Sequence, residues 1–255
     1  MIRTYESKDE EQCIRIFREV GWMEGKDTDK DVFEASISEA TPFVAELNGE
    51  VEVFVVTKTG SCMYLNEDIP FSAVTGVVTS RIARQQGIAS TVTVRAIEES
   101  AKNGAAMSML GMFDQGYYDK LGFGTLPYHR ISTFNPAKLK VPKLQRTPVR
   151  LTIENAKEMH ESRLRRMRGH GSCNLDGEGA TKEELTGRKN HFGLGFRDEG
   201  GVLTHYLYCK AKGEHGPYSV RFSVYETYEQ FIELLSLLKS LSDQVHGVRM
   251  EDPPC

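Results

Sequence analysis

The sequence predicts an α+β (α/β) fold with a mixed central sheet, followed by a second domain that repeats its element order. Three patterns lead to this prediction. An apolar, β-branched run over 73–80 passes through a basic glycine turn into a helical pattern over 90–104. Ahead of it, short apolar runs joined at Asn48-Gly49 are typical of antiparallel hairpins. After a proline-containing stretch at 136–149, strand and helix patterns begin again.

Local patterns predict the elements of the first half in order. Ser7 is expected to cap a helix whose apolar face includes Phe17, with Glu10 in the capping-box position. Thr59-Gly60 is expected to form a turn. The predicted elements are a strand over 2–5, a helix over 8–20, a short helix over 31–38, strands over 42–47, 51–57, 62–65 and 73–79, a helix over 90–104 and a strand over 105–110. A further short helix is expected to end at Gly122, and Phe123 to start the next strand.

The second half carries a similar series. Thr227 is expected to cap a helix whose apolar stripe belongs to the core. The four arginines within 163–171 are interpreted as a solvated helix end and not as a nucleic-acid patch. The predicted elements are a strand over 150–153, a helix over 156–167, strands over 201–211 and 217–225, a helix after 227 and a strand over 245–250.

Composition excludes several classes of function. The chain has 255 residues, of which 39% are hydrophobic and 27% charged, with a net charge of -4. This acidic balance provides no basic field for nucleic acid or for an anionic membrane. No segment approaches the ~20 apolar residues that span a bilayer, and the polar N-terminus lacks an apolar signal core. We therefore expect a cytoplasmic protein without nucleic-acid or membrane partners.

The cysteines and histidines indicate neither a disulfide framework nor a metal site. The cysteines are odd in number and widely spaced, and no two form a C-x-x-C pair. They are typical of free thiols in a reducing compartment. Histidine and cysteine residues within 160–191 lack metal-ligand spacing, so no metal is expected. The five cysteines are Cys13, Cys62, Cys173, Cys209 and Cys255.

Residues 84–89 carry the strongest functional signal. A glycine turn between a strand and a helix directs free backbone amides and the positive end of the helix dipole at one spot, which suits phosphate. Gly87 permits a close approach, and Arg84 adds a planar cation. The spacing of a Rossmann site or a P-loop is absent. By itself, such a turn is also ordinary in any α/β protein. The run reads Arg84-Gln85-Gln86-Gly87-Ile88-Ala89.

Two motifs together resemble the GNAT N-acetyltransferases. R-x-x-G-x-A at 84–89 is similar to the family's pyrophosphate signature, and Tyr118-Asp119-Lys120-Leu121-Gly122-Phe123 resembles its Y-x-K-L-G-F signature. The resemblance implies a sheet whose two parallel strands splay apart around acetyl-CoA, the acyl donor. It implies that Tyr118 gives a proton to the departing thiolate, with packing as the alternative role. The residues it assigns to the cofactor are Val77 and Thr79 through their backbones, and Arg84, Gln85, Gly87, Ile88, Ala89 and Ser90 around the pyrophosphate.

The second half lacks both motifs and resembles a degenerate GNAT domain. This organisation is similar to the Eis-like (enhanced intracellular survival) tandem-GNAT group, which implies self-association into a homo-oligomer. The predicted division is a catalytic domain over 1–135, a linker over 136–149 and a second domain over 150–255. Members of that group usually continue into a third domain, so the chain is either a short member or a fragment. The general base is left open between the Cys255 carboxylate, Glu46, Glu52 and a water chain.

The sequence thus predicts an N-acetyltransferase in which a primary amine of a small molecule or peptide attacks the thioester directly. An aminoglycoside, a polyamine or a protein lysine are each compatible acceptors. Trp22 is interpreted as packing, with the acceptor pocket as its alternative place. The alternative function is a non-catalytic acyl-CoA-binding or regulatory module.

Overall fold

The computed structural model describes residues 1–111, 115–126 and 130–252. The chain divides into two compact units, one of residues 1–126 with 173–186 and the other of residues 127–172 with 187–255. This division differs from the predicted one in two ways. The second unit begins before residue 135, because strand β6 (Ile131–Phe134) pairs with β12 (Val248–Glu251). Residues 173–186 return to the first unit, because β8 (Cys173–Leu175) pairs with β3 (Glu50–Tyr64).

The first unit is built on a six-stranded mixed sheet in the order β1-β2-β3-β4-β5, with β8 added beside β3. All neighbours are antiparallel except β4 and β5, which run parallel. The hairpin between β2 and β3 has left-handed backbone at Asn48 and Gly49, as the sequence predicted. The remaining strands are β1 (Ile2–Thr4), β2 (Ala40–Leu47), β4 (Glu67–Thr79) and β5 (Met107–Met109).

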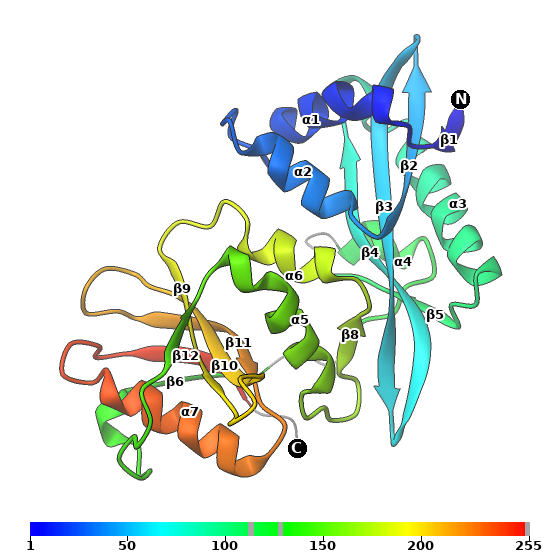
Figure 1. The fold of residues 1–255 in the computed structure, drawn as a ribbon. Helices are drawn as coiled ribbons and strands as arrows, with labels where there is room; N and C mark the ends of the chain where they lie inside the picture. Colours follow the sequence, from blue (N-terminus) through cyan, green and yellow to red (C-terminus); the bar gives the residue numbers. More distant parts are fainter. Residues whose placement is uncertain (112–114, 127–129, 253–255) are drawn as a thin grey trace. The chain divides into compact units, whose positions relative to one another are not determined.

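Helices cover both faces of this sheet (Figure 1). Helices α1 (Glu10–Glu19) and α2 (Asp29–Ile37) pack on one face, where Phe17, Phe33 and Phe54 share a core cluster. Helix α3 (Ile88–Lys102) packs on the other face against a cluster that includes Val53, Val74 and Val92. Strand alternation places Phe54 and Val56 of β3 in the cluster on the α1 face, and Val53 and Val55 in the cluster on the α3 face. Helix α6 (Glu178–Leu185) follows β8 and packs beside α2.

Three local predictions for this unit were wrong. The capping box before α1 is formed by Glu6 and Asp9, not by Ser7, and Glu6 donates its amide to Asp9 Oδ2 at 2.8 Å. Strand β3 continues through Gly60 without a turn. The residue is a glycine because a side chain there would collide with the Asn174 carbonyl of β8, so it marks a close approach of two backbones. Phe123 starts no strand; it follows the turn at the end of α4 (Gln115–Asp119).

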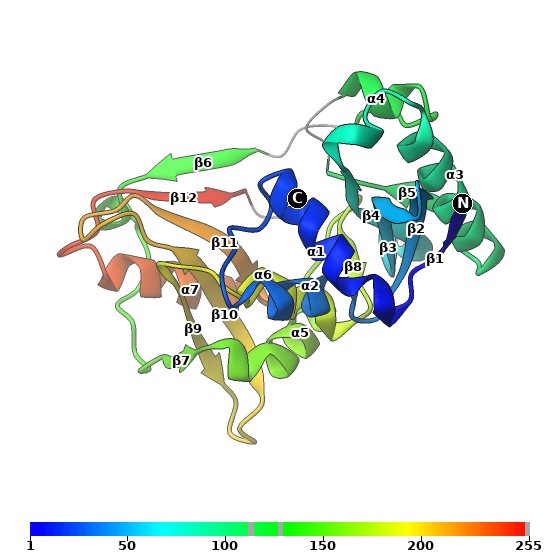
Figure 2. The same cartoon turned by 90° about the horizontal axis from the view of Figure 1, so that it is seen from above.

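The second unit, whose strands are labelled in Figure 2, repeats the topology of the first by its strand order. Its sheet has the order β6-β12-β11-β10-β9-β7, in which β11 and β12 are parallel and the other neighbours antiparallel. A helix links the parallel pair in both units, so the predicted degenerate GNAT-like fold is confirmed. The strands are β7 (Val149–Leu151), β9 (His191–Arg197), which the sequence reading missed, β10 (Leu203–Lys210) and β11 (Tyr218–Val224).

Two helices cover opposite faces of the second sheet. Helix α7 (Tyr228–Ser240) packs on the face with Leu207, and α5 (Ala156–Arg165) packs on the face with Tyr206, whose hydroxyl donates to the Met159 carbonyl at 3.1 Å. Thr227 caps α7 in a capping box, as predicted. The stretch 136–149 contains a 3-10 turn over Pro136–Lys138.

Candidate active site

Strand β4 has an open edge at its C-terminal end. Its parallel pairing with β5 covers only the rungs from Phe71–Met107 to Ala73–Met109. On the other side, the pairing with β3 continues to Thr79. In the part of the chain that the structure describes, no further strand pairs with β4 beyond Ala73 on the β5 side. The two parallel strands therefore diverge after three rungs.

The backbone of Val77 and Thr79 faces this open edge. Ser80 donates its amide to the Glu52 carbonyl at 2.9 Å, which makes residues 80 and 52 a hydrogen-bonded pair. Hydrogen-bonded and non-hydrogen-bonded pairs alternate along an antiparallel ladder. The pairs Val53–Thr79 and Val55–Val77 are consequently non-hydrogen-bonded, and the amides of Thr79 and Val77 point away from β3. This is the orientation that backbone bonding to an extended ligand requires.

The turn after β4 delivers the N-terminus of α3 to the same end of the strand. Gly87 is the N-cap residue and has φ +77°, a left-handed conformation that glycine adopts without strain. The first backbone bond of the helix runs from Thr91 N to the Gly87 carbonyl. No side chain caps this end, and the first turn holds no acidic residue. The amides of Ile88, Ala89 and Ser90 are therefore free to bind an anion.

Arg84 and Arg81 lie in the same turn but differ in their partners. The Arg81 guanidinium donates to the Glu19 carbonyl at 3.0 Å, and its backbone amide donates to the Glu19 carboxylate. Arg81 thus fastens the turn to the end of α1. Arg84 is exposed and makes no hydrogen bond or ion pair with any other described residue. Of the two arginines, Arg84 is the cation available to a ligand.

The other predicted cofactor residues surround this turn. Val77, Ile88 and Ala89 pack against the core cluster under α3, so they form part of the support of the site. Gln85 is exposed and has φ +60°, a left-handed conformation that costs a glutamine more than a glycine. Ser90 is half-buried in the first turn of α3.

Tyr118 lies in α4 and is 7% exposed. Its ring contacts Phe123 edge-on at a centroid distance of 5.9 Å, and Phe123 packs against the same cluster as Val77. Its carbonyl accepts the amides of Leu121 and Phe123, which closes the turn after α4. These contacts connect Tyr118 to the cofactor segment through one residue.

Tyr117 precedes Tyr118 in α4 and is not among the predicted site residues. Its ring meets that of Tyr118 edge-on at 4.8 Å. Its hydroxyl is buried and has no hydrogen-bond partner among the residues placed by the structure. An unpaired buried hydroxyl costs free energy. Helix α4 therefore contains a second tyrosine hydroxyl, beside that of Tyr118, that is a candidate proton donor.

The carboxylates considered as bases have different surroundings. Glu46 accepts from the Arg3 guanidinium at 2.6 Å, and its side chain is 26% exposed. Glu52 is 3% exposed; its Oε1 accepts from Arg15 at 3.1 Å, while its buried Oε2 has no partner in the described chain. Ser80, directly opposite Glu52, also has a buried hydroxyl without a partner there. Cys255, the third candidate, lies outside the described residues.

Trp22 lies over the diverging part of β4. A methyl group at Gly76 would be 3.8 Å from Trp22 Cζ3. The ring packs edge-on against Phe17 at 5.7 Å and is 50% exposed, so it both packs and presents a face. Asp29 accepts from Arg18 at 2.7 Å and from the Gly25 amide at 2.9 Å, which holds the loop that carries Trp22. Burial acts to raise the pKa of Asp29, but these hydrogen bonds outweigh it and lower the pKa.

Metal-ligand clusters, membrane-spanning helices and cavities of the described chain provide no alternative to this site. Among residues 1–111, 115–126 and 130–252, no three His, Cys, Asp or Glu side chains gather as metal ligands, and no helix is long and apolar enough to cross a membrane. Described residues of the first unit line one cavity of about 290 Å³, and described residues of the second unit line another of the same volume; the predicted cofactor residues line neither of these. The cavity of the first unit lies at the opposite end of β4, beside Pro70 and Phe71.

Comparison with known families agrees with this geometry. Residues 1–126 match the model of an acetyltransferase (GNAT) domain. No curated protein matches the chain in sequence. The matched segment contains both the turn at 84–89 and Tyr118, and it ends where the first unit's first segment ends.

Solved structures share the fold over the whole chain. A GCN5-related N-acetyltransferase from Anabaena variabilis has a TM-score of 0.79 at 11% identity, covering 99% of this chain and 66% of its own. A probable N-acyltransferase from Enterococcus faecalis has a TM-score of 0.77 at 15% identity, covering 99% and 64%. Eis1 from Mycobacterium abscessus has a TM-score of 0.76 at 15% identity, covering 100% and 66%. The chain thus spans about two thirds of the length of these structures, and the likeness is one of fold.

Proposed function

The chain belongs to the GNAT acetyltransferases through residues 1–126, and from this premise we propose that it transfers an acetyl group from acetyl-CoA to a primary amine. The open edge of β4 beyond Ala73, which leads to the uncapped first turn of α3, carries the proposal. A strand edge offers amides to an extended ligand, and a helix N-terminus offers amides to phosphate. The pantetheine arm and the pyrophosphate of acetyl-CoA have these two chemistries.

Each predicted residue has a role in this proposal. The amides of Val77 and Thr79 bond the pantetheine arm. Arg84 provides the charge that pairs with the pyrophosphate, beside the backbone amides of Gly87 and its neighbours. Gln85 shapes the turn and contributes a neutral side chain, so that one arginine supplies the charged contact. The amides beyond Gly87 are those of Ile88, Ala89 and Ser90.

The reaction needs a neutral amine and a proton for the leaving group. The amine nitrogen attacks the thioester carbonyl carbon, the carbon–sulfur bond breaks, and an amide and free CoA result. Tyr118 gives its proton to the departing thiolate. The proton released by the amine goes to a base, for which Glu52 is favoured because its buried Oε2 is unpaired in the described chain and its opposite neighbour Ser80 is unpaired too.

The acceptor is proposed to be a cationic amine of a small molecule or peptide. The half-exposed Trp22 ring beside Gly76 supports this choice, because an aromatic face attracts a cation. The net charge of -4 acts in the same direction. A cytoplasmic location and self-association stay predictions. A non-catalytic acyl-CoA-binding module remains the alternative, since it would need the same cofactor residues.

Calorimetric titration with acetyl-CoA tests the proposal. The wild type should bind with micromolar affinity, and the double variant Arg84→Ala, Gly87→Glu should lose the heat. The double variant Arg81→Ala, Gly49→Glu is a matched control: Arg81 is held by Glu19, and Gly49 has the same left-handed conformation in a distant hairpin. Absence of binding by the wild type would refute the cofactor assignment. Binding without turnover of any amine in a panel of polyamines, aminoglycosides and lysine peptides would favour the binding module.

A further inference from the structure

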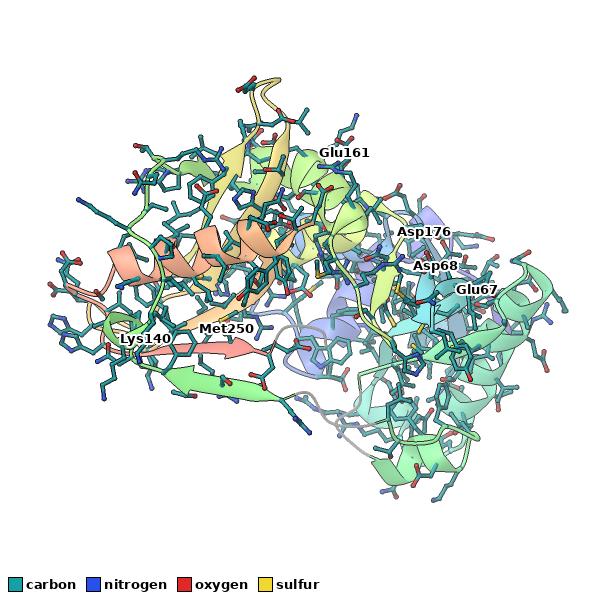
Figure 3. The ribbon with its side chains drawn as sticks, turned by 90° about the horizontal axis from the view of Figure 1, so that it is seen from below. Glu67, Asp68, Lys140, Glu161, Asp176 and Met250 are labelled. Carbon is teal, nitrogen blue, oxygen red and sulfur yellow. The ribbon has the colours of Figure 1, made fainter. Side chains whose placement is uncertain are left out.

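Two cysteines of the first unit lie directly opposite each other. Strand β8 pairs antiparallel with β3, and the register places Cys173 opposite Cys62. Directly opposite residues point to the same face of a sheet. In sequence the two are far apart, and neither belongs to the cofactor turn or to α4. Figure 3 labels two residues in this part of the unit, Asp176 directly after β8 and Asp68 on β4, which pairs with β3.

The type of pair formed by Cys62 and Cys173 follows from one backbone bond. The Asp176 amide donates to the Thr59 carbonyl at 3.1 Å, so Thr59 and Asp176 are a hydrogen-bonded pair. Three rungs further along the alternating ladder, Cys62 and Cys173 form a non-hydrogen-bonded pair. The Cα atoms of such a pair are about 4.5 Å apart, which lies within the ~4.4–6.8 Å range of disulfides.

The two thiols differ in exposure. Cys62 is 4% exposed, whereas Cys173 is half-buried. The Cys173 Sγ lies 3.3 Å from Met109 Sδ, and Met109 forms the last rung between β5 and β4. An oxidant therefore reaches Cys173 more readily than Cys62, and Cys173 adjoins the point where the two parallel strands diverge.

We propose that Cys62 and Cys173 are a site of reversible oxidation that forms a cross-strand disulfide between β3 and β8. A hydroperoxide oxidises the Cys173 thiol to a sulfenic acid and is reduced to an alcohol, or to water if it is hydrogen peroxide. The Cys62 thiol then attacks the Cys173 sulfur, the disulfide forms, and one water leaves. Two electrons and two protons pass from the thiols to the hydroperoxide, and a dithiol reductant reverses the reaction.

The disulfide would fasten the returning segment 173–186 to the first unit. Without it, backbone pairing between β8 and β3 covers the rungs from Gly60–Leu175 to Cys62–Cys173. A crosslink that closes a loop of roughly a hundred residues restricts the unfolded chain strongly. This inference does not depend on the proposed acetyl transfer.

Mass spectrometry of the full chain tests the proposal. A Cys255→Ser background removes the terminal thiol from the count, and stoichiometric hydrogen peroxide is the oxidant. The expected result is a loss of about 2 Da per molecule, a tryptic peptide that links Cys62 to Cys173, and reversal by dithiothreitol. Thermal unfolding of the oxidised form should occur at a higher temperature than that of the reduced form.

Two variants serve as controls. Cys62→Ala and Cys173→Ala should each abolish both the mass loss and the thermal shift, whereas Cys209→Ala should retain them, because Cys209 lies in the second unit. If a destabilised variant fails to fold, the linked peptide of the parent protein still decides the matter. Retention of all thiols, a linkage between other cysteines, or a crosslink only between molecules would overturn the proposal.

Discussion

The amide of Ser80 donates to the carbonyl of Glu52 at 2.9 Å, and this bond decides which backbone groups of β4 are exposed at its edge. Because the pair is hydrogen-bonded, the neighbouring Thr79 turns its amide outward. The side chains of Ser80 and Glu52 share the face covered by α1, where Arg15 contacts Glu52 at 3.1 Å. One rung of the ladder thus adjoins both the proposed cofactor edge and the proposed base.

Glu52→Gln is expected to lower kcat roughly a hundredfold, as the loss of a general base does, while the Kd for acetyl-CoA changes less than about twofold. The amide keeps the volume of the side chain and an acceptor for Arg15, so the cofactor edge should be retained. Steady-state kinetics with saturating acetyl-CoA and calorimetry separate the two effects. Glu46→Gln is the matched control, because it removes a carboxylate that is bonded to an arginine, Arg3, on the adjacent strand. Equal losses of kcat in both variants would contradict a role of Glu52 as base.

Arg84→Ala should raise the Kd for acetyl-CoA about tenfold or more, because a charge-assisted hydrogen bond is lost. The dependence of Kd on salt should also weaken. Arg81→Ala, measured beside it, should leave the Kd within about twofold, since an exposed ion pair with Glu19 contributes about 1 kcal/mol or less to stability. If the two variants changed the Kd equally, the turn would act through its shape and not through Arg84.

Tyr118→Phe should reduce kcat by roughly 10²–10⁴-fold, the usual effect of removing a general acid, and should leave the Kd for acetyl-CoA unchanged. Tyr117→Phe is expected to keep kcat and to stabilise the fold slightly, because it removes a buried hydroxyl that has no partner in the described chain. Stopped-flow acetylation and thermal unfolding of both variants distinguish the two tyrosines. A larger kcat loss in Tyr117→Phe would transfer the proposed role to Tyr117.

Sequence patterns were sufficient for most of the fold where local chemistry decides the structure. The hairpin at Asn48-Gly49 and the helix start at Thr227 were predicted correctly, because each depends on the backbone conformation and hydrogen bonds of neighbouring residues. The turn predicted at Gly60 was wrong. A glycine is needed there because the strand of residues 173–175, which is distant in sequence, packs closely against this position. Residue spacing contains no information on such a long-range contact. The same long-range pairing explains why the unit boundary differs from the predicted one.

The candidate site was predictable to a similar extent. The motif at 84–89 indicated the turn, and the left-handed Gly87 with its uncapped helix agrees with that interpretation. The sequence could not distinguish Arg84 from Arg81, because the difference lies in Glu19 at the end of another helix. The motifs assign no role to Ser80, although its position two residues after the buried Val78 places it on the α1 face.

The second unit should lose stability when the pH falls below about 6.5. Burial lowers the pKa of His205 from its ordinary value of 6.5, and this effect outweighs the hydrogen bond to Glu233, which raises it. The ring is 2% exposed and stacks on Phe196 at 5.0 Å. Below pH 6.5 the unfolded chain binds a proton at this histidine before the folded chain does, so the free energy of unfolding decreases as the pH falls.

Urea unfolding between pH 5.5 and 8 measures this dependence. His205→Gln should flatten the decrease without abolishing it, because burial also lowers the pKa of His191, which stacks on Tyr208. The double variant with His191→Gln should be flatter still. Glu233 contributes in a separate range: hydrogen bonding from Arg146 lowers its pKa, so its contribution is lost only as the pH falls below the ordinary value of 4.5. A wild type that gained stability from pH 7 to 5.5 would show that His205 is charged in the fold, paired with Glu233 as an ion pair.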